Sequence, residues 1–258
     1  MKKIKVGIFG PAGRMGSDIL LRIPNFKNLE ISSLCERKGH LSVGKSLCGC
    51  MIHEDVKKII SSSDVIIDFT IPKATIQLLE TLKNNKDVCL VTGTTGYSEK
   101  EEKLFKKLSH GLKVLRSFNM SIGINLLRNL VEVSSKRIGN FSDIEISEIH
   151  HNKKRDIPSG TAMILADSIK QGNTKVNKFS FREKGSNSQR KMHEIGFSSI
   201  RGGDVVGEHT VYFFMDGERI ELTHKATDRK IFSNGALEAA GWLYNKKPGL
   251  YSIIDMLG

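Results

Sequence analysis

The sequence has few cysteines, and their spacing suits neither a metal site nor a disulfide-bonded fold. The four are Cys35, Cys48, Cys50 and Cys89, in a chain of 258 residues. They form no C-x-x-C pair and no histidine cluster accompanies them, so neither a zinc site nor a disulfide framework is indicated. We therefore predict reduced thiols and no bound metal.

Long apolar runs are also lacking. No stretch approaches the ~18 consecutive apolar residues that can span a bilayer. The chain enters a strand-like pattern at residues 3–9 without a signal or transit segment before it. We expect no membrane partner and a cytoplasmic location.

A recognisable nucleic-acid-binding motif is missing too, although the net charge is +12. The lysines are scattered through predicted helices and loops, as at Lys100, Lys103 and Lys106. We expect no nucleic-acid partner, because a basic charge without a motif is weak support for one. Small polyanions such as a dinucleotide or a dicarboxylic acid suit the same charge.

A glycine-rich turn stands out among the features that are present. Residues 3–9 read as a buried strand, and Gly10, Gly13 and Gly16 follow it before an apolar helical run at residues 19–21. The first glycine permits a tight turn, the second lets the backbone approach a pyrophosphate, and the third allows close helix–strand packing. The G-x-x-G-x-x-G spacing is one residue longer than the commoner dinucleotide fingerprint, and the strand–turn–helix context supports it.

A charged pair occupies the position expected for a ribose-binding residue. Residues 29–34 form a second apolar run, which ends at Glu36 and Arg37, some 20 residues after Gly16. An acidic residue there favours a free ribose 2′-hydroxyl, whereas an arginine can meet a 2′-phosphate. We predict that both NADH and NADPH are accepted; the alternative is that the two residues belong to a solvated loop.

Strands and helices continue to alternate through the first half of the chain. Apolar runs at residues 64–70, 88–91 and 113–116 predict three more strands, and Ser98 with Glu101 predicts a capping box. The second of these strands leads into Gly93-Thr94-Thr95-Gly96, where backbone and hydroxyls could approach a planar ligand. A plain turn is the alternative for that segment. The polar exit at residues 117–125 is where the fold could hinge.

The pattern changes after residue 138. Strand-like pieces dominate at residues 143–150, 176–182, 194–200, 210–215 and 218–224, and Asp216-Gly217 marks a hairpin between the last two. One main helix is expected at residues 161–169, and a helix rich in small residues at 234–243. We predict an α/β protein, with a Rossmann-like dinucleotide-binding domain at residues 1–121 and a second α+β domain with a mixed or antiparallel sheet at 122–230. Residues 231–258 are expected to pack back on the first domain.

Residues 148–161 combine two imidazoles, several cations and a glycine-hydroxyl turn. A strand is expected to end near His150, and a helix to begin near Ser159. The N–H groups of Ser159, Gly160 and Thr161 would then point at an anion, and a carboxylate would suit them. The alternatives are that one histidine is only a scaffold residue and that the lysines and Arg155 lie in a solvated loop.

The chain resembles the 4-hydroxy-tetrahydrodipicolinate reductase family, also called the dihydrodipicolinate reductase family, from end to end. The segments that carry the resemblance are residues 10–16, 68–70, 93–96, 119–123, 150–161, 201–209 and 223–226. Two positions depart from the family pattern: Ile157 stands where alanine is usual, and Arg155 is also unusual.

The resemblance implies that a nicotinamide cofactor, NADPH or NADH, delivers hydride to a cyclic unsaturated dicarboxylic acid. It assigns His150 and Lys154 to proton handling, and His151, Ser159, Gly160 and Thr161 to substrate binding. The implied cofactor contacts are Gly10, Pro11, Ala12, Gly13, Arg14, Met15, Glu36, Arg37, Gly93, Thr94, Thr95, Ser117, Phe118, Asn119 and Met120. It also implies a homotetramer joined through the second domain and a hinge that closes the domains over the substrate.

Three rival classes remain at this point. Another NAD(P)-dependent dehydrogenase would share the first half but should lack the constellation at residues 150–161. A non-catalytic dinucleotide sensor would bind NADPH without turnover, and His150 and Lys154 speak against it. A nucleic-acid-binding protein would show salt-sensitive binding to DNA or RNA.

Overall fold

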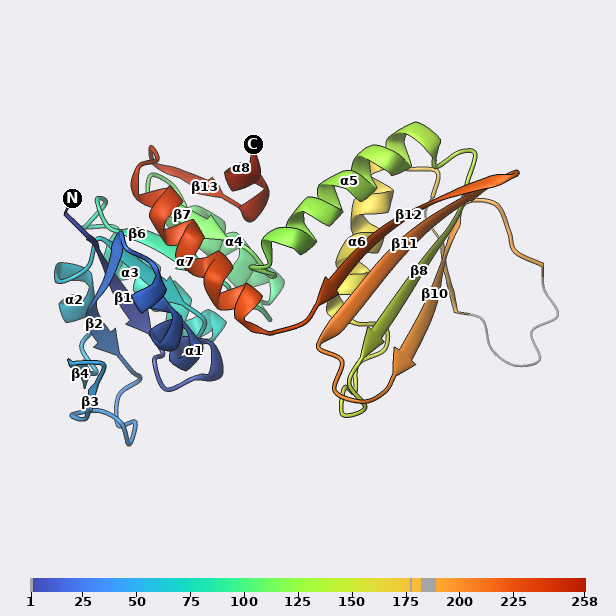
Figure 1. The fold of residues 1–258 in the computed structure, drawn as a ribbon. Coiled ribbons are helices and arrows are strands. Elements are labelled where there is room, and N and C mark those ends of the chain that lie inside the picture. Colours follow the sequence, from blue (N-terminus) through green and yellow to red (C-terminus); the bar gives the residue numbers. More distant parts are fainter. Residues whose placement is uncertain (1, 177, 182–188) are drawn as a thin grey trace. The chain divides into compact units, whose positions relative to one another are not determined.

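The computed structural model describes residues 2–176, 178–181 and 189–258 (Figure 1). The chain forms two compact units: unit 1 comprises Met1–Ile122 with Lys230–Gly258, and unit 2 comprises Gly123–Arg229. The strand predicted at residues 176–182 lies partly outside the described residues. Among the described residues, no helix is long and apolar enough to cross a membrane.

Unit 1 is built on an eight-stranded sheet in the order β13-β7-β6-β5-β1-β2-β4-β3. All of its paired strands are parallel except β3 and β4, which are antiparallel. Its strands are β1 (Ile4–Phe9), β2 (Leu29–Cys35), β3 (Ser46–Leu47), β4 (Cys50–His53), β5 (Val65–Asp68), β6 (Cys89–Thr92), β7 (Lys113–Arg116) and β13 (Gly249–Tyr251). Its helices are α1 (Arg14–Arg22), η1 (Ile23–Asn25), α2 (Val56–Ser61), α3 (Pro72–Leu82), α4 (Glu99–Ser109), α7 (Lys230–Tyr244) and α8 (Ile253–Leu257).

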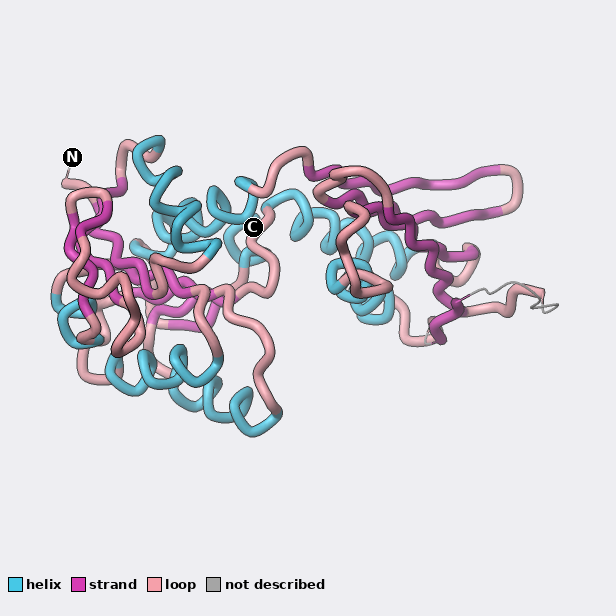
Figure 2. Tube along the Cα trace, turned by 90° about the horizontal axis from the view of Figure 1, so that it is seen from below, coloured by secondary structure: helices cyan, strands magenta, loops and turns pink. Residues whose placement is uncertain are grey.

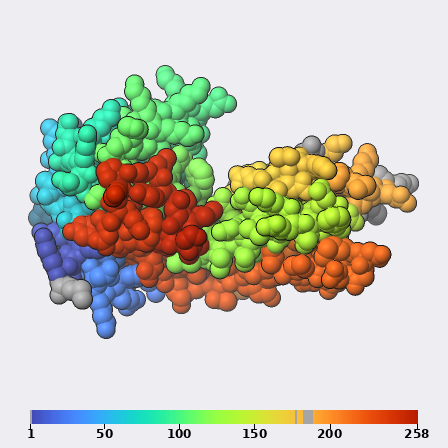
Figure 3. All heavy atoms as spheres, turned by 90° about the horizontal axis from the view of Figure 1, so that it is seen from above, coloured from blue at the N-terminus to red at the C-terminus, as the bar shows by residue number. Residues whose placement is uncertain are grey.

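Helices cover both faces of this sheet (Figure 2). Alternate side chains of β5 show why: Ile67 packs with α1 and α7, whereas Ile66 packs with α2, α3 and α4. Strands buried on both faces read as continuous apolar runs, which is the pattern that the sequence has here. The C-terminal helices therefore complete the core of unit 1, and their atoms lie against it in Figure 3.

Helix α7 approaches the sheet closely because its contact face is made of small residues. A Cβ at Gly235 would lie 1.9 Å from the Met120 carbonyl oxygen, so only glycine fits there without a shift. Ala236, Ala239 and Ala240 are fully buried on the same helix. The loop that ends at Met120 is thereby fixed against α7.

Unit 2 contains a five-stranded mixed sheet in the order β12-β11-β8-β10-β9. The strands are β8 (Asp143–His150), β9 (Lys178–Phe181), β10 (Glu194–Arg201), β11 (Gly207–Met215) and β12 (Glu218–Ala226). Helices α5 (Ile122–Ile138) and α6 (Gly160–Gly172) pack against one face, and the two helices lie side by side (Figure 3). The predicted fold class, a Rossmann-like sheet with a second mixed-sheet domain, is confirmed.

Candidate active site

A cavity of about 520 Å³ lies at the carboxyl ends of β1, β2 and β5 in unit 1. The predicted cofactor residues Gly10, Gly13, Glu36 and Arg37 line it. Its other lining residues were not predicted as site residues: Phe9, Lys38, Glu54, Val56, Phe69, Thr70, Ile71, Ala74 and Gln77. Apolar walls with a few charged groups are typical of a ligand cleft.

The glycine turn between β1 and α1 is shaped by the absence of side chains. Gly10 has a φ of +84°, and a Cβ at Gly16 would lie 2.2 Å from the Gly10 carbonyl oxygen. Gly13 is the N-cap of α1 and offers no side-chain cap. The N–H groups of the first helical turn, where Arg14 and Met15 lie, are thus left to an external anion such as a pyrophosphate, so the turn fits a dinucleotide.

Glu36 is fixed at the end of β2 by two backbone donors. Its carboxylate accepts hydrogen bonds from the N–H of Ala12 at 3.1 Å and from the N–H of Arg37 at 3.1 Å. The side chain therefore bridges the glycine turn and the next loop. A ribose could be bound by this carboxylate, with Arg37 and Lys38 beside it on the cavity wall.

The segments after β5 and β6 meet at the same edge of the sheet around the buried carboxylate of Asp68. Asp68 accepts hydrogen bonds from the hydroxyls of Thr75 at 2.5 Å, Thr92 at 3.0 Å and Thr94 at 3.3 Å. The Thr94 hydroxyl thus faces the protein interior. A Cβ at Gly93 would lie 2.1 Å from the Phe69 ring, so this glycine lets the ring pack on the backbone.

Residues 117–120 form a loop that is held by hydrogen bonds within the loop itself. The Ser117 hydroxyl donates to the Asn119 carbonyl oxygen at 2.7 Å, and the Ser121 N–H donates to the Asn119 side-chain oxygen at 2.9 Å. Met120 is buried, whereas Phe118 is exposed. A ligand at this loop would meet mainly backbone and the Phe118 ring.

Arg116 ties this loop to α4 and to Tyr97, which follows the Gly93–Gly96 segment. Its guanidinium donates to both oxygens of Glu102 at 2.8 and 2.6 Å. The same group lies 4.3 Å from the Tyr97 ring centroid and 4.7 Å from that of Phe118. Arg116 was not predicted as a support of the site; an arginine at the end of a strand, close in sequence to aromatic residues, was the available signal.

A second candidate site lies in unit 2, where the helix-side face of the sheet changes from apolar to polar. Along β8, Ile144 and Ile146 are buried, and Glu148 and His150 continue the same buried stripe. The alternation of a strand makes these two side chains neighbours on one face. Arg201 pairs with His150 across the sheet, and His209 pairs with Glu148.

Glu148 connects the groups of this cluster. Its carboxylate contacts His150 Nδ1, accepts from Arg201 at 2.9 and 2.7 Å, and accepts from the Ser159 N–H at 3.3 Å. Burial raises the pKa of Glu148, but hydrogen bonds from Arg201 and neighbouring groups outweigh it, so its pKa lies below the ordinary value. The carboxylate is ionised at neutral pH.

The two imidazoles of the cluster are kept neutral at pH 7. Burial lowers the pKa of His209 to about 3, with the nearby His150 as a second cause. Burial also lowers the pKa of His150, although Glu148 opposes that change. The rings stand edge to face with centroids 5.0 Å apart, and His209 Nε2 lies 3.0 Å from the Ser159 hydroxyl.

The start of α6 forms an anion-binding corner with Lys154. Ser159 is the N-cap, and its hydroxyl accepts from the Ala162 N–H at 3.1 Å. Lys154 Nζ lies 2.9 Å from a carboxylate oxygen of Asp156. The hydrogen bond from Lys154 lowers the pKa of Asp156, and the backbone N–H of Gly160 contributes in the same direction. No atom lies within 4 Å of a Cβ built on Gly160, so that side of the corner is open.

His151 lies apart from the buried cluster. Its Nε2 is 3.4 Å from the guanidinium of Arg229, and both residues line a surface cavity of about 460 Å³ together with Lys153. Unit 2 thus brings His150, Lys154, Ser159 and Gly160 to one end of its sheet, with His151 on an adjoining surface.

Glu148, His150 and His209 also satisfy the spacing of a metal site. Both oxygens of Glu148, however, already accept from the Arg201 guanidinium. A fixed cation therefore occupies the place where a metal would bind the carboxylate, and this donor set fits a metal poorly.

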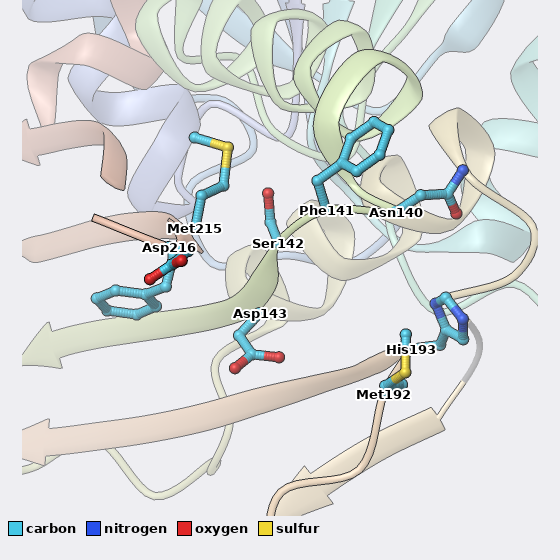
Figure 4. A pocket seen from close by; sticks show the side chains of 9 residues that line it. Asn140, Phe141, Ser142, Asp143, Met192, His193, Met215 and Asp216 are labelled. Atoms are coloured by element: carbon cyan, nitrogen blue, oxygen red, sulfur yellow. The ribbon is translucent and has the colours of Figure 1, made fainter. Parts of the chain in front are cut away.

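A different hollow of about 400 Å³ lies at the opposite end of β8 (Figure 4). Its side chains come from the α5–β8 turn, from the segment before β10 and from the β11–β12 hairpin. Asp143 is paired there with Arg190 at 3.0 Å, and Met192 is largely exposed. This hollow offers no counterpart, among the described residues, to the buried cluster around His150.

Glu148, Arg201 and His209 were not predicted individually as site residues. Glu148 could have been found from its place two residues before His150 on the same strand face. Arg201 and His209 lie within the segment 201–209 that carried the family resemblance, but only strand register shows that they meet Glu148.

A parallel sheet with an open glycine turn, joined to a mixed-sheet unit with an acid–base cluster, defines a class of two-domain oxidoreductases that use nicotinamide dinucleotides. Family models agree with this class. The model for the N-terminus of dihydrodipicolinate reductase matches residues 4–120, and that for its C-terminus matches residues 123–257. The chain belongs to the dihydrodipicolinate reductase family and is an NAD(P)H-dependent oxidoreductase.

Curated relatives span the whole chain. The 4-hydroxy-tetrahydrodipicolinate reductase of Nitratiruptor sp. is 42% identical over 257 residues, which cover 99% of each chain. The protein of the same name from Pelagibacter ubique is 40% identical over 260 residues, covering 100% of this chain and 99% of the relative.

Solved structures show the same fold at lower identity. A dipicolinate-bound dihydrodipicolinate reductase from Paenisporosarcina sp. TG-14 has a TM-score of 0.80 at 22% identity, with 97% of both chains covered. A DAP dehydrogenase of C. glutamicum has a TM-score of 0.58 at 13% identity, covering 99% of this chain and 94% of that one. These matches show a shared fold.

Proposed function

We propose that the protein reduces (2S,4S)-4-hydroxy-2,3,4,5-tetrahydrodipicolinate to tetrahydrodipicolinate, a step of lysine and diaminopimelate biosynthesis. One NADH or NADPH and one proton are consumed, and one water is released. The observation that carries the proposal is the corner formed by Lys154 and the start of α6, where Lys154 Nζ already binds a carboxylate, that of Asp156, at 2.9 Å and also lies near the His150 ring.

Unit 1 binds the dinucleotide in this proposal, and the bound nicotinamide supplies the hydride. The glycine turn at Gly10, Pro11, Ala12, Gly13, Arg14 and Met15 holds the pyrophosphate. Glu36 accepts from a ribose hydroxyl, while Arg37 and the neighbouring Lys38 offer positive charge to a 2′-phosphate. We expect both nucleotides to be accepted because the Glu36 carboxylate suits a free 2′-hydroxyl, whereas Arg37 and Lys38 on the same cavity wall suit a 2′-phosphate.

The loops after β6 and β7 position the reactive end of the dinucleotide. Gly93, Thr94 and Thr95 offer backbone groups, since the Thr94 hydroxyl is held by Asp68. Ser117, Phe118, Asn119 and Met120 form a loop that hydrogen-bonds internally, and the exposed Phe118 ring provides an apolar surface. Preorganised loops of this kind orient the ligand at little entropic cost.

Unit 2 binds the dicarboxylate and handles its protons. A substrate carboxylate takes the place of Asp156 at Lys154 and at the N–H groups of Gly160 and Thr161. Ser159 holds the helix start, and His151 contacts the second carboxylate. His150 and Lys154 exchange protons with the ring as water leaves and hydride arrives.

We further propose a cytoplasmic homotetramer joined through unit 2. The sheet face opposite α5 and α6 carries a polar hollow lined by Thr210, Tyr212, Glu221 and Thr223, among others, and such groups can pair across a two-fold axis. The described cysteines are free, including the exposed Cys48, which suits a reducing compartment. Light scattering coupled to size-exclusion chromatography tests the assembly, and a monomer would contradict it.

The activity is tested by coupling the purified protein to an upstream synthase that makes the cyclic dicarboxylate. Absorbance of the reduced cofactor is followed with NADH and with NADPH in separate reactions. We expect oxidation of both that depends on the synthase product. Oxidation of neither, with a protein that still binds NADPH, would rule out the proposed reaction and leave a binding role.

A further inference from the structure

The carboxylate of Glu148 has no part in the substrate and cofactor contacts proposed above, yet it is the direct partner of His150. We propose that Glu148, held in place by Arg201, is a positioning residue that keeps the proton of neutral His150 on Nδ1 and so leaves Nε2 to exchange protons with the substrate. This proposal rests on the proposed function, in which His150 exchanges protons with the substrate. It adds that Glu148 and Arg201 hold the His150 ring in the tautomer that this exchange requires.

Glu148 is anchored on every side that the structure describes. Its side chain is 1% exposed, and its two oxygens accept from Arg201 at 2.9 and 2.7 Å. One oxygen also contacts His150 Nδ1, and the other accepts from the Ser159 N–H. A carboxylate with bidentate arginine and no access to water cannot rotate freely, so it presents a fixed acceptor to the ring.

Arg201 is itself immobilised by the backbone. Its guanidinium donates to the Asp156 carbonyl oxygen at 2.7 Å and to the Ile200 carbonyl oxygen at 2.8 Å. Because β10 pairs with β8 so that Arg201 lies opposite His150, sheet register sets the position of the charge. The loop that carries Lys154 is thereby connected, through the Asp156 carbonyl, to the same carboxylate–guanidinium pair.

The other ring nitrogen has room beside it. A Cβ built on Gly207 would lie 3.0 Å from His150 Nε2, so a larger residue at 207 would crowd that atom. The charged and titratable groups around the ring are Glu148 on its own strand, Arg201 on β10, His209 on β11 and Lys154 on the following loop. Of these, Glu148 alone raises the proton affinity of His150, while burial, Lys154 and Arg201 lower it.

The substitution Glu148→Gln makes a sharp prediction because the Ser159 N–H would orient the new amide. Arg201 meets both oxygens of Glu148, but the Ser159 N–H, which can only donate, meets the oxygen that does not contact His150. The glutamine oxygen would therefore take that position and the glutamine NH2 would face His150 Nδ1. His150 would then accept at Nδ1 and carry its proton on Nε2, the reverse of the proposed arrangement. The loss of the negative charge would also lower the pKa of His150.

The experiment is ¹⁵N NMR of the imidazole rings at pH 8, with His150 assigned by comparison with His150→Gln, alongside the pH profile of kcat. In the unchanged protein we expect a protonated Nδ1 and a bare Nε2. In Glu148→Gln we expect the two nitrogens to exchange roles, kcat to fall by roughly 10²-fold, and the acid limb of the profile to move to lower pH, because the carboxylate that raises the pKa of His150 is gone. The dissociation constant for NADPH should not change, since the glycine turn belongs to unit 1.

Glu145→Gln is the matched control. Glu145 lies on the same strand but on the opposite sheet face, where it pairs with another arginine, Arg190. We expect the His150 signals and the pH limb to stay as in the unchanged protein. If Glu148→Gln fails to fold, Glu148→Asp keeps a carboxylate and should keep the proton on Nδ1, and Arg201→Lys should keep that tautomer with a lower kcat.

Retention of a protonated Nδ1 in Glu148→Gln, or an Nε2 proton in the unchanged protein or in Glu148→Asp, would overturn the proposal. The ring spectrum requires no turnover, so it separates the two claims. A protein without reductase activity but with the expected tautomer exchange contradicts the proposed function and supports the positioning role of Glu148.

Discussion

The two units prepare for charged ligands by opposite means. At the end of β1 in unit 1 the turn is made of glycines: Gly10, Gly13 and Gly16 have no side chains that could cover the backbone N–H groups at the start of α1. These N–H groups are therefore accessible to an anionic ligand. At the end of β8 in unit 2 the chain instead buries titratable side chains, with Glu148, His150 and His209 at most 7% exposed. The first arrangement suits a ligand that only has to be held, and the second suits one whose protons have to move.

The difference has an energetic consequence. Backbone N–H groups at a helix start do not titrate, so they keep their partial positive charge at every pH. A buried cluster of one carboxylate, one guanidinium and two neutral rings depends on each member being in the right protonation state. We therefore expect substitutions in unit 1 to act mainly on dinucleotide affinity, and substitutions or acid in unit 2 to act on turnover and on the stability of that unit.

The largest expected effect is on turnover in Lys154→Ala. Removing the ammonium beside Asp156 should lower kcat/KM for the dicarboxylate by roughly 10²–10⁴-fold, the usual contribution of a proton-handling group. NADPH affinity, measured by fluorescence titration, should be unchanged. The exposed Lys175 in the same unit provides the control Lys175→Ala, which should stay within about threefold, because a surface charge away from the site contributes little. Equal losses in both variants would contradict a special role for Lys154.

The elements that the sequence predicted correctly are those that neighbouring residues determine. The apolar residues Ile144, Ile146 and Ile149 predicted β8 at residues 143–150, which are its observed bounds, and Asp216-Gly217 predicted the β11–β12 hairpin. The capping box at Ser98 and Glu101 is present. These are local signals, in which neighbouring residues determine the structure.

Elements and contacts that depend on distant residues were missed. Strands β3 and β4 and helix α2 are only two to six residues long, too short for a periodic pattern. Helix α6 runs three residues beyond the predicted Ile169, because its last turn packs on α5, where a Cβ at Gly172 would meet the Glu132 carbonyl oxygen. The contact between Glu148 and Arg201 joins residues 53 positions apart, and only the parallel register of β8 and β10 brings them together.

The second prediction concerns the backbone design of unit 1. In Gly16→Ala the new Cβ would lie 2.2 Å from the Gly10 carbonyl oxygen and 2.8 Å from Pro11 Cα, so the turn has to shift. We expect the NADPH dissociation constant to rise by about tenfold to a hundredfold, since misplaced donors no longer meet the pyrophosphate. Isothermal titration calorimetry measures it.

Gly241→Ala is the control for that substitution. Its Cβ would lie 3.2 Å from the Nδ2 atom of the exposed Asn28 side chain, which can move aside. NADPH affinity should be unchanged, and helix α7 should gain up to about 1 kcal/mol from the better helix former. Weakened binding in both variants would mean that general destabilisation, and not the turn, accounts for Gly16→Ala.

The third prediction is that unit 2 loses stability in mild acid. The pKa of His209 is lowered to about 3 in the folded chain, so the unfolded chain takes up a proton first as pH falls below about 6.5. Stability is therefore full above that value and declines toward pH 3, by about 2 kcal/mol at pH 5 from this residue. Burial lowers the pKa of His150 and His224 in the same direction.

Hydrogen exchange at pH 7.5 and pH 5, corrected for intrinsic rates, measures this loss on peptides from β8, β11 and α6. In His209→Gln the decline with pH should be shallower, because the titrating group is gone. The exposed His110 in unit 1 provides the control His110→Gln, which should leave the slope unchanged. An identical slope in all three proteins would show that the buried ring of His209 does not set the acid response.

The smallest expected effects compare two serine N-caps, one in each unit. Ser98 caps α4 at an exposed site, and Ser98→Ala should cost about 1 kcal/mol of unfolding free energy and leave turnover unchanged. Ser159 also caps a helix, but its buried hydroxyl lies 3.0 Å from His209 Nε2 as well. Ser159→Ala should therefore cost about 1–2 kcal/mol more in urea unfolding, because the imidazole nitrogen loses its partner in the interior. Equal costs would mean that the two caps differ only in burial, and that the polar network of unit 2 adds nothing to stability beyond an ordinary helix cap.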